Sequence, residues 1–256
     1  MRRALSCMEN ALLPRAALCL LCGDPRRAGG QDCLCPACRE GLSRLRLRDQ
    51  VCLRCMTPLD EHGRCAFCAA GGLEGLQEGF AAFRHRGAAR ELVMQLKYRY
   101  CDEAADALAL AMAQCVPLGR YDALVPVPLH ARRQRTRGGN QAEILCRALS
   151  PRLGLPVLNL LTRVRETREQ TSLARGDRLR NVQGAFSLAG EARGLRLLIV
   201  DDVRTTGATA RACAQALSQG GARKLGILTA TAAVQEEGKH GINAGFSPAH
   251  GAAAGR

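Results

Sequence analysis

Two adjacent carboxylates, followed by a stretch rich in threonine and glycine, are the residues of this chain best suited to bind a small ligand. Asp201 and Asp202 come directly after four apolar residues, 197–200, which predict a buried strand. The loop that follows, and that opens a predicted helix, consists of Thr205, Thr206, Gly207, Ala208 and Thr209. Helix N-termini attract anions, hydroxyls add donors and glycine allows close approach, so this loop predicts a phosphate site. The carboxylates would repel a phosphate and suit instead the hydroxyls of a sugar, or a Mg²⁺ ion that holds them.

Arginine-rich loops follow two other predicted strands and could meet at the same edge of a sheet. Residues 129–140 follow a predicted strand at Tyr121–Val127, and residues 162–181 follow one at Val157–Leu161. Their candidate anion-binding side chains are Arg133, Arg135, Arg137, Arg168 and Arg180. From residue 132 to 180 there are twelve arginines against four acidic residues, whereas a solvated surface more often balances the two signs. We therefore favour an anion-binding lid, with a solvated charged loop as the alternative.

Two further features admit either a chemical or an ordinary structural role. His130 could act as a base, but a histidine after a proline turn is more often a surface group. Residues 97–100 alternate two cations with two tyrosines, a pattern that can hold phosphates and stack on bases. For that segment we favour one buried tyrosine and solvated cations. With only five Phe, three Tyr and no Trp in the whole chain, stacking on bases would be limited.

The fourteen cysteines are unevenly distributed, since ten of them precede residue 70. Eight form four Cys-x-x-Cys pairs, separated by 12, 13 and 9 residues: Cys19/Cys22, Cys35/Cys38, Cys52/Cys55 and Cys65/Cys68. Two such pairs supply the four thiolates of a closed tetrahedral site, so we expect two structural zinc ions. Disulfides are the rival interpretation, which a reducing compartment disfavours. Spacing does not determine which two pairs share a metal ion. We favour sequential groups, 19/22/35/38 and 52/55/65/68, because they close the shorter loops. Cys33 breaks the two-residue spacing and is left out.

Strands alternate with helices from about residue 79 to 233, which predicts a mostly parallel sheet with helices on both faces. Further strands are predicted at 79–83, 182–188 and 224–230. Ligands of such α/β folds bind at the carboxyl ends of the strands, where all three loops described above begin. We expect a lead-in helix at 1–18, a double zinc ribbon at 19–70, the α/β domain at 78–233 and a disordered tail at 234–256.

The formal net charge of +14 favours anionic partners, either a polyphosphate ligand or a nucleic acid. Two zinc ions held by eight thiolates would lower the charge to about +10, which is still strongly positive. A GC-rich genome would explain the preference for arginine over lysine but not the excess over acids. No apolar run reaches the ~18 residues of a membrane helix. Residues 1–21 faintly resemble a secretory signal, but Pro14 and Arg15 interrupt it, so we expect a cytoplasmic protein.

Residues 200–209 resemble the phosphoribosyl pyrophosphate motif of type I phosphoribosyltransferases. Together with the cysteine pairs and residues 96–98, 125–129, 137–142 and 180–186, they make the chain resemble the ComF (GntX-like) family over about residues 15–233. The resemblance implies a type I phosphoribosyltransferase-like fold that binds phosphoribosyl pyrophosphate with Mg²⁺. It also implies a link to DNA uptake in competent bacteria or to nucleotide metabolism. As partners it implies single-stranded DNA and competence proteins such as a DNA helicase, and no membrane.

The resemblance also implies roles for individual residues. Asp201 and Asp202 would face the ribose hydroxyls and Mg²⁺ as the catalytic pair, and residues 205–209 would cradle the 5′-phosphate. The loop at 130–140 would lie near the pyrophosphate, and residues 163–181 would close over the ligand.

Two residues depart from the pattern of the family. Arg204 stands where the motif usually has an aliphatic residue, and it could point to solvent or add a cation near the phosphate. Gly139 stands where the family usually has an aromatic residue, which puts a stacking contact there in question. The surrounding positions, Arg137, Gly138, Asn140 and Gln141, keep the pattern.

Two functions of different classes fit these residues. The favoured one is a phosphoribosyltransferase with an unknown acceptor, in which Mg²⁺ and arginines stabilise the departing pyrophosphate. No persuasive general base is evident, and a reaction driven by leaving-group stabilisation needs little base catalysis. The alternative is a non-catalytic module that binds single-stranded DNA through the arginine surface and the zinc ribbons. Such binding would depend mostly on phosphates and would weaken steeply with salt.

Overall fold

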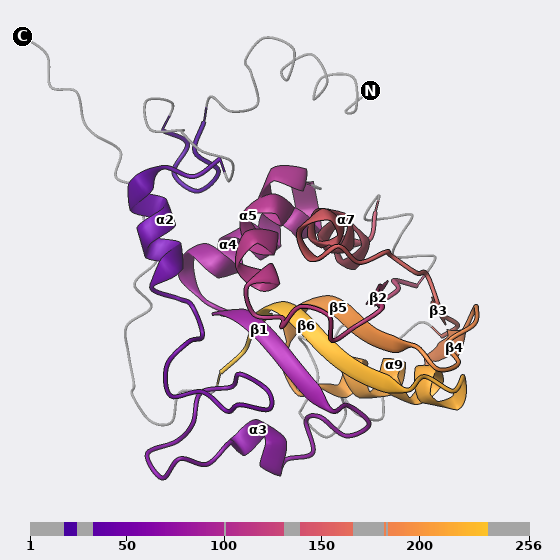
Figure 1. Cartoon of the computed structure of the whole chain (residues 1–256). Helices are drawn as coiled ribbons and strands as arrows, with labels where there is room; N and C mark the ends of the chain where they lie inside the picture. Colours follow the sequence, from indigo (N-terminus) through magenta and orange to yellow (C-terminus); the bar gives the residue numbers. More distant parts are fainter. Residues whose placement is uncertain are drawn as a thin grey trace, which may run out of the picture.

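Four parallel strands form the central sheet of the protein (Figure 1). The computed structural model describes residues 18–24, 33–99, 101–130, 139–165, 182 and 184–234. The strands are β1 (Glu78–Arg84), β2 (Ala123–Pro126), β5 (Arg196–Arg204) and β6 (Lys224–Ala232), in the spatial order β1-β6-β5-β2. All three neighbouring pairs are parallel, so every strand has its carboxyl end at the same edge of the sheet. The predicted parallel sheet is therefore confirmed.

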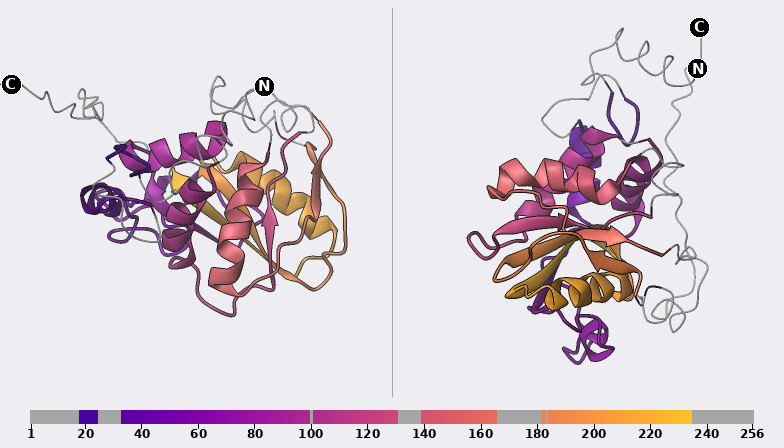
Figure 2. Two further views of the ribbon diagram at one scale, coloured as in Figure 1. Left: turned by 90° about the horizontal axis from the view of Figure 1, so that it is seen from above. Right: turned by 90° about the vertical axis from the view of Figure 1, so that its right-hand side faces the viewer.

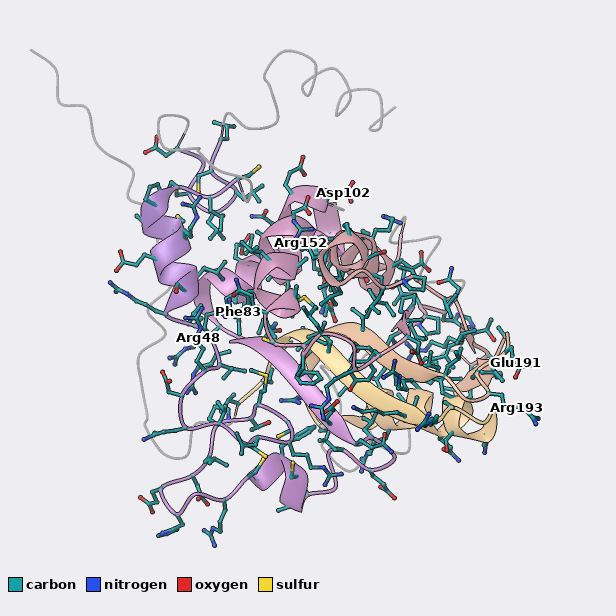
Figure 3. All side chains as sticks on the ribbon, viewed as in Figure 1. Arg48, Phe83, Asp102, Arg152, Glu191 and Arg193 are labelled. Carbon is teal, nitrogen blue, oxygen red and sulfur yellow. The ribbon has the colours of Figure 1, made fainter. Side chains whose placement is uncertain are left out.

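Helices cover both faces of this sheet, as the alternation of strands and helices predicts. On one face lie α4 (Gly87–Arg99), α5 (Asp102–Ala113) and α7 (Gln141–Leu153), and on the other lies α9 (Ala208–Gln219) (Figures 1 and 2). Side chains fill the space between the sheet and both helix layers (Figure 3). Each face has its own apolar cluster: Leu198 and Val200 of β5 belong to the α4–α5–α7 cluster, and Leu197 and Ile199 to the α9 cluster. This alternation is that of a strand buried on both sides.

A separate antiparallel pair, β3 (Leu161–Arg163) and β4 (Phe186–Leu188), lies beside α9. The sequence predicted longer strands at Val157–Leu161 and Val182–Leu188, and that prediction is wrong in extent and pairing. Val157 makes only an isolated parallel bridge to Leu124 of β2, a strand of four residues. The chain then turns away and pairs with its own later segment.

The cysteine-rich region packs on both faces of the sheet. Helix α2 (Pro36–Ser43) lies beside α4, and the short helix α3 (Ala66–Ala69) lies on the opposite side of the sheet (Figure 1). Each helix starts directly after a cysteine, and the thiols of Cys35 and Cys65 cap them by accepting from the N–H groups of Cys38 and Cys68. The Cys-x-x-Cys pairs 35/38 and 65/68 therefore lie at the starts of these two helices.

The remaining predictions about the ends of the chain lie outside the described residues. These are the lead-in helix at 1–18, of which only Leu18 is described, and the tail at 234–256, of which only Val234 is described. Among the helices that the structure does describe, none is long and apolar enough to cross a membrane.

Candidate ligand site at the end of β5

Strand β5 continues through the acid pair instead of ending before it. It includes Asp201 and Asp202 and runs to Arg204, three residues before Gly207 starts the turn into α9. Gly207 has a φ of +78°, a left-handed conformation that favours glycine, and it stands at the N-cap position of α9 without a side-chain cap. The predicted order of strand, acids, hydroxyl loop and helix N-terminus is present. The difference is that both acids are part of the strand and do not follow it.

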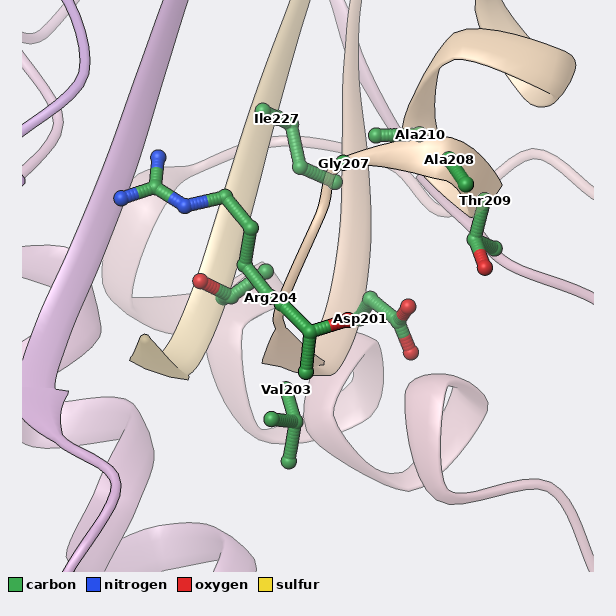
Figure 4. Close-up of a pocket in the computed structure, with 10 residues that line it drawn as sticks. Asp201, Val203, Arg204, Gly207, Ala208, Thr209, Ala210 and Ile227 are labelled. Carbon is green, nitrogen blue, oxygen red and sulfur yellow. The ribbon is translucent and has the colours of Figure 1, made fainter. Parts of the chain in front are cut away.

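Asp201 is the acid that faces the loop. Its carboxylate points to the side of the strand on which Thr209 lies, while the Arg204 side chain extends away from it (Figure 4). Asp201, Arg204, Thr205 and residues 207–209 line a small hollow together with Thr229 of β6. Although Asp201 is partly exposed, burial of its carboxylate and the adjacent charge of Asp202 raise its pKa to about 8.

Asp202 lies on the other face, where it forms an ion pair with Lys97. Lys97 Nζ lies 3.0 Å from Asp202 Oδ2, and this joins α4 to the end of β5. Thr231 donates its hydroxyl to the Asp202 carbonyl at 3.3 Å, and His85 Nδ1 lies 2.8 Å from the same hydroxyl. Burial and the charge of Lys97 lower the pKa of His85. The cation expected to be solvated at Lys97 is therefore a partner of the acid pair, while Tyr98 beside it is 62% exposed.

The loop at 205–209 lies directly against the second cysteine group. A Cβ atom at Gly207 would lie 2.3 Å from the Gly72 carbonyl oxygen and 3.1 Å from Phe67 Cζ. Arg211, in the first turn of α9, donates to the Gly71 carbonyl at 2.9 Å. The chain just after Cys68 therefore supports the backbone of the candidate phosphate loop.

Arg204 takes neither of the two orientations that the sequence suggested. Its side chain points neither to solvent nor toward the phosphate loop but into the second cysteine region, where it is 4% exposed. Its Nη2 donates to Thr57 Oγ1 at 2.9 Å, and its guanidinium lies 4.4 Å from the centre of the Phe67 ring. A charged residue in an otherwise apolar pattern was the only signal in the sequence for this contact, which bridges 147 positions.

The predicted arginine ligands lie outside the described residues. These are Arg133, Arg135, Arg137, Arg168 and Arg180. At the edges of these segments, His130 is partly buried, and Asn140 has a structural role. Its side chain accepts from the N–H of Ala142 at 3.1 Å and donates to the Val127 carbonyl at 3.0 Å, so it caps α7 and ties it to β2. That these five arginines lie near the loop at 205–209 stays a prediction.

The eight paired cysteines form two groups, and their composition is the sequential one. The first group is Cys19, Cys22, Cys35 and Cys38, the second is Cys52, Cys55, Cys65 and Cys68, and within each the four sulfur atoms lie within 4.8 Å of one another. Sulfur–sulfur contacts are 3.8 Å in the first group and 3.4 and 3.9 Å in the second. A disulfide requires about 2.05 Å, and none of the described cysteines forms one.

These distances fit a metal ion bound by four thiolates. Tetrahedral zinc with Zn–S bonds of about 2.3 Å separates its ligands by about 3.8 Å. Each group supplies four ligands, which leaves no open position for a substrate, so either group could bind a structural zinc ion. Cys33 belongs to neither group.

Comparison with known proteins adds relatives that are named for DNA utilization or for competence. No family model matches the chain. DNA utilization protein YhgH of Salmonella typhi is 42% identical over 144 residues, which cover 53% of this chain and 63% of that protein. Competence protein F of Haemophilus influenzae is 43% identical over 110 residues, 41% of this chain and 46% of that protein. The chain thus spans less than two thirds of the length of these relatives.

A longer but weaker match comes from competence protein ComFC of Bacillus subtilis, which is 24% identical over 197 residues, 73% of this chain and 79% of that protein. Among solved structures, a glutamine phosphoribosylpyrophosphate amidotransferase of B. subtilis is 20% identical, with a TM-score of 0.37 over 54% of this chain and 30% of that one. A likeness of that extent supports no functional conclusion.

Proposed function

We propose that the chain, which is similar to competence and DNA-utilization proteins, is a member of the ComF family and binds phosphoribosyl pyrophosphate at the carboxyl end of β5. The observation that supports this most is the order of groups along one edge: Asp201 faces the loop at 205–209, which leads into α9 without a side-chain cap. N–H groups and hydroxyls would hold the 5′-phosphate, and the acid pair would hold the ribose diol.

The acid pair is arranged so that its charge does not repel the anionic ligand. Lys97 offsets the charge of Asp202, and the raised pKa of Asp201 means that this carboxyl holds a proton over much of the neutral range. A divalent cation would displace that proton. Mg²⁺ prefers carboxylate, phosphate and water oxygens, so Asp201 and Asp202 would supply part of its shell and the ligand the rest. Once bound, it would offset the negative charge of a leaving pyrophosphate.

Transfer of the phosphoribosyl group is the reaction class that this binding mode suits. Bond cleavage between the ribose and pyrophosphate requires stabilisation of the departing oxygens, and the arginines at 133, 135 and 137 are the candidates for that role. The ribose carbon would then be attacked by an acceptor, whose pocket we leave unassigned. The two cysteine groups would bind zinc and have a structural role.

Single-stranded DNA binding is the second candidate, supported by the net charge of +14 and by the names of the relatives. It would use phosphate contacts, because Tyr98 is the one exposed aromatic in the described part of the 97–100 segment. Binding should then fall by orders of magnitude between about 50 and 200 mM salt. Affinity that is independent of salt would exclude this mode.

The test is calorimetric titration of the full chain with Mg²⁺ and phosphoribosyl pyrophosphate, followed by an assay for pyrophosphate release. Asp201→Asn and Asp202→Asn should each lower the affinity by about 10–100-fold, since each removes a charged hydrogen-bond acceptor for the diol and the cation. Release of pyrophosphate distinguishes transfer from binding.

Glu191→Gln is the matched control, because it removes one carboxylate whose side chain is 81% exposed and which lies at the edge of the molecule (Figure 3). It should leave the affinity unchanged. A wild-type chain that gives no binding heat, or acid-pair variants that bind as tightly as the wild type, would overturn the proposed function.

A further inference from the structure

The buried guanidinium of Arg204 has no ordinary partner for its charge. It is 4% exposed, it donates one hydrogen bond to a neutral hydroxyl of Thr57, and it stacks on Phe67. Its Nη1 is buried without a hydrogen-bond acceptor among the described residues, and within the same part of the chain it forms no ion pair with a carboxylate. A buried cation without an opposite charge is costly, so a counter-charge is required.

The second cysteine group lies next to this cation. Thr57 and Phe67, which contact Arg204, are each within two residues of a cysteine of that group. Cys55, which belongs to that group, is completely buried. Four thiolates around one Zn²⁺ leave a net charge of about −2. This metal site would therefore supply the negative counter-charge that the Arg204 guanidinium lacks.

The same region supports the loop at 205–209. Gly72 and Phe67 lie against Gly207, and Gly71 accepts from Arg211, so the chain around Cys68 contacts the middle of the loop and the first turn of α9. Arg204 directly precedes the loop. A shift of the guanidinium would therefore move the start of the loop and its support together.

We propose that Arg204 is a positioning residue that provides the counter-charge for zinc bound by the second cysteine group and thereby couples zinc occupancy to the geometry of the 205–209 loop. The first half concerns this chain's own metal site and is independent of any ligand. The second half rests on the proposed function of the loop. Loss of the Arg204 charge should weaken zinc binding in the second group alone, and loss of that zinc should weaken phosphate binding.

The experiment compares three variants of the full chain loaded with two zinc ions. Arg204→Gln removes the charge but keeps a donor for Thr57, and Arg204→Lys keeps the charge. Arg46→Gln is the control, since Arg46 also lies over a phenylalanine, 5.5 Å from the centre of Phe83, but contacts Gln114 and Ala111. Zinc release to a chromogenic chelator is followed in time, and affinity for Mg²⁺–phosphoribosyl pyrophosphate is measured by calorimetry.

In R204Q, one zinc equivalent should leave about 10–100 times faster, as expected for loss of an outer partner of a metal site, while the other keeps its wild-type rate. R204K should stay close to the wild type, and R46Q should match it. Equal release from R204Q and the wild type would overturn the proposal, and so would equal acceleration in R204Q and R204K, which would show a packing role. If R204Q does not fold, the neutral variant Arg204→Met takes its place, and its rate of zinc release is compared with that of R204K in the same way.

Failure of this inference differs from failure of the proposed function. If the wild type does not bind phosphoribosyl pyrophosphate but R204Q still releases one zinc faster, the function is wrong and the counter-charge stands. If the wild type binds the ligand and R204Q retains both its zinc and its affinity, the coupling is wrong and the function stands.

Discussion

The two cysteine groups have the same four ligands but lie in different surroundings. The first joins the apolar cluster of α4, α5 and α7, with Gln95 of α4 donating to the Leu20 carbonyl at 2.7 Å. The second joins the cluster of α9, where Phe67, Thr57 and Gly72 lie against the end of β5 and the loop that follows it. One group therefore supports a helix layer, and the other supports the candidate ligand site.

This difference shows that a metal motif does not by itself determine its role. Local spacing assembles both groups in the same way, with 12 and 9 residues between their cysteine pairs. What separates them is the surface on which each one packs. The following four tests address that separation, beginning with the largest expected effect.

Removal of one ligand from each group would break the comparison most directly. Cys55→Ser should remove one zinc equivalent and lower the free energy of unfolding on the order of 4–5 kcal/mol, because Cys55 is fully buried and its site collapses without metal. Affinity for phosphoribosyl pyrophosphate should fall at least about tenfold, since the loop loses its support. Zinc content, urea denaturation and calorimetry measure the three quantities.

The matched variant in the first group is Cys38→Ser. It should also lose one zinc equivalent and a similar free energy of unfolding, while the ligand affinity stays within about twofold of the wild type. Equal loss of affinity in both variants would abolish the distinction between the groups.

A methyl group at Gly207 tests the contact between the second group and the loop. Gly207→Ala combines the left-handed backbone at φ +78° with a Cβ only 2.3 Å from the Gly72 carbonyl oxygen. Unfolding free energy should drop by about 3 kcal/mol, more than backbone strain alone would cost. Gly154→Ala is the control, with φ +65° and open space around the added atom, and it should cost about 1–2 kcal/mol and leave ligand affinity unchanged.

The pH dependence of stability tests how far the Asp201 carboxyl is buried in the hollow at the end of β5. Its folded-state pKa of about 8 lies above the unfolded value of about 4, so the folded state holds more protons between these limits. Stability attributable to this group is therefore present below pH 4 and decreases as the pH rises toward 8. Asp201→Asn should flatten that part of the profile by about 1–2 kcal/mol in thermal denaturation, a value reduced for its partial exposure.

Asp122, paired with Arg196 at the opposite end of β5, should behave in the reverse way. Hydrogen bonds and the charge of Arg196 lower the pKa of Asp122 to about 2, so its contribution is present above pH 4 and is lost as the pH falls through 2. If the stability of D201N changed with pH from 4 to 8 in the same way as that of the wild type, the burial of the Asp201 carboxyl would be contradicted.

The smallest effect is expected for the aromatic ring beneath Arg204. Phe67→Leu removes a cation–π contact at 4.4 Å and should cost about 1 kcal/mol, with a slight acceleration of zinc release from the second group. Phe186→Leu removes the corresponding contact with Arg163 at 5.3 Å and has the same 8% exposure. It should leave the release of zinc unchanged, and chelator kinetics of the two variants measured together make the comparison.

Local patterns predicted the elements and the composition of the cysteine groups, because hydrophobic periodicity and knuckle spacing act over a few residues. The strand at the acid pair, its helix and the parallel sheet were all predicted. The contacts of Arg204 with Thr57 and of Lys97 with Asp202 were not, since they join segments about a hundred or more residues apart. The β3–β4 pair escaped prediction for a related reason, as its short strands bind each other and not the sheet.

The position of β6 has a consequence for synthesis on the ribosome. Strand β6 lies between β1 and β5, so the sheet cannot close until the residues from Lys224 onward have emerged. At about 5–20 residues per second, the roughly 150 residues after Cys68 require about 10–30 s. The thiols of both groups need only short local loops to meet, so metal can be acquired by a nascent chain whose sheet does not yet exist. If zinc is scarce during that interval, the sheet would form while the cysteine groups still lack their metal ions.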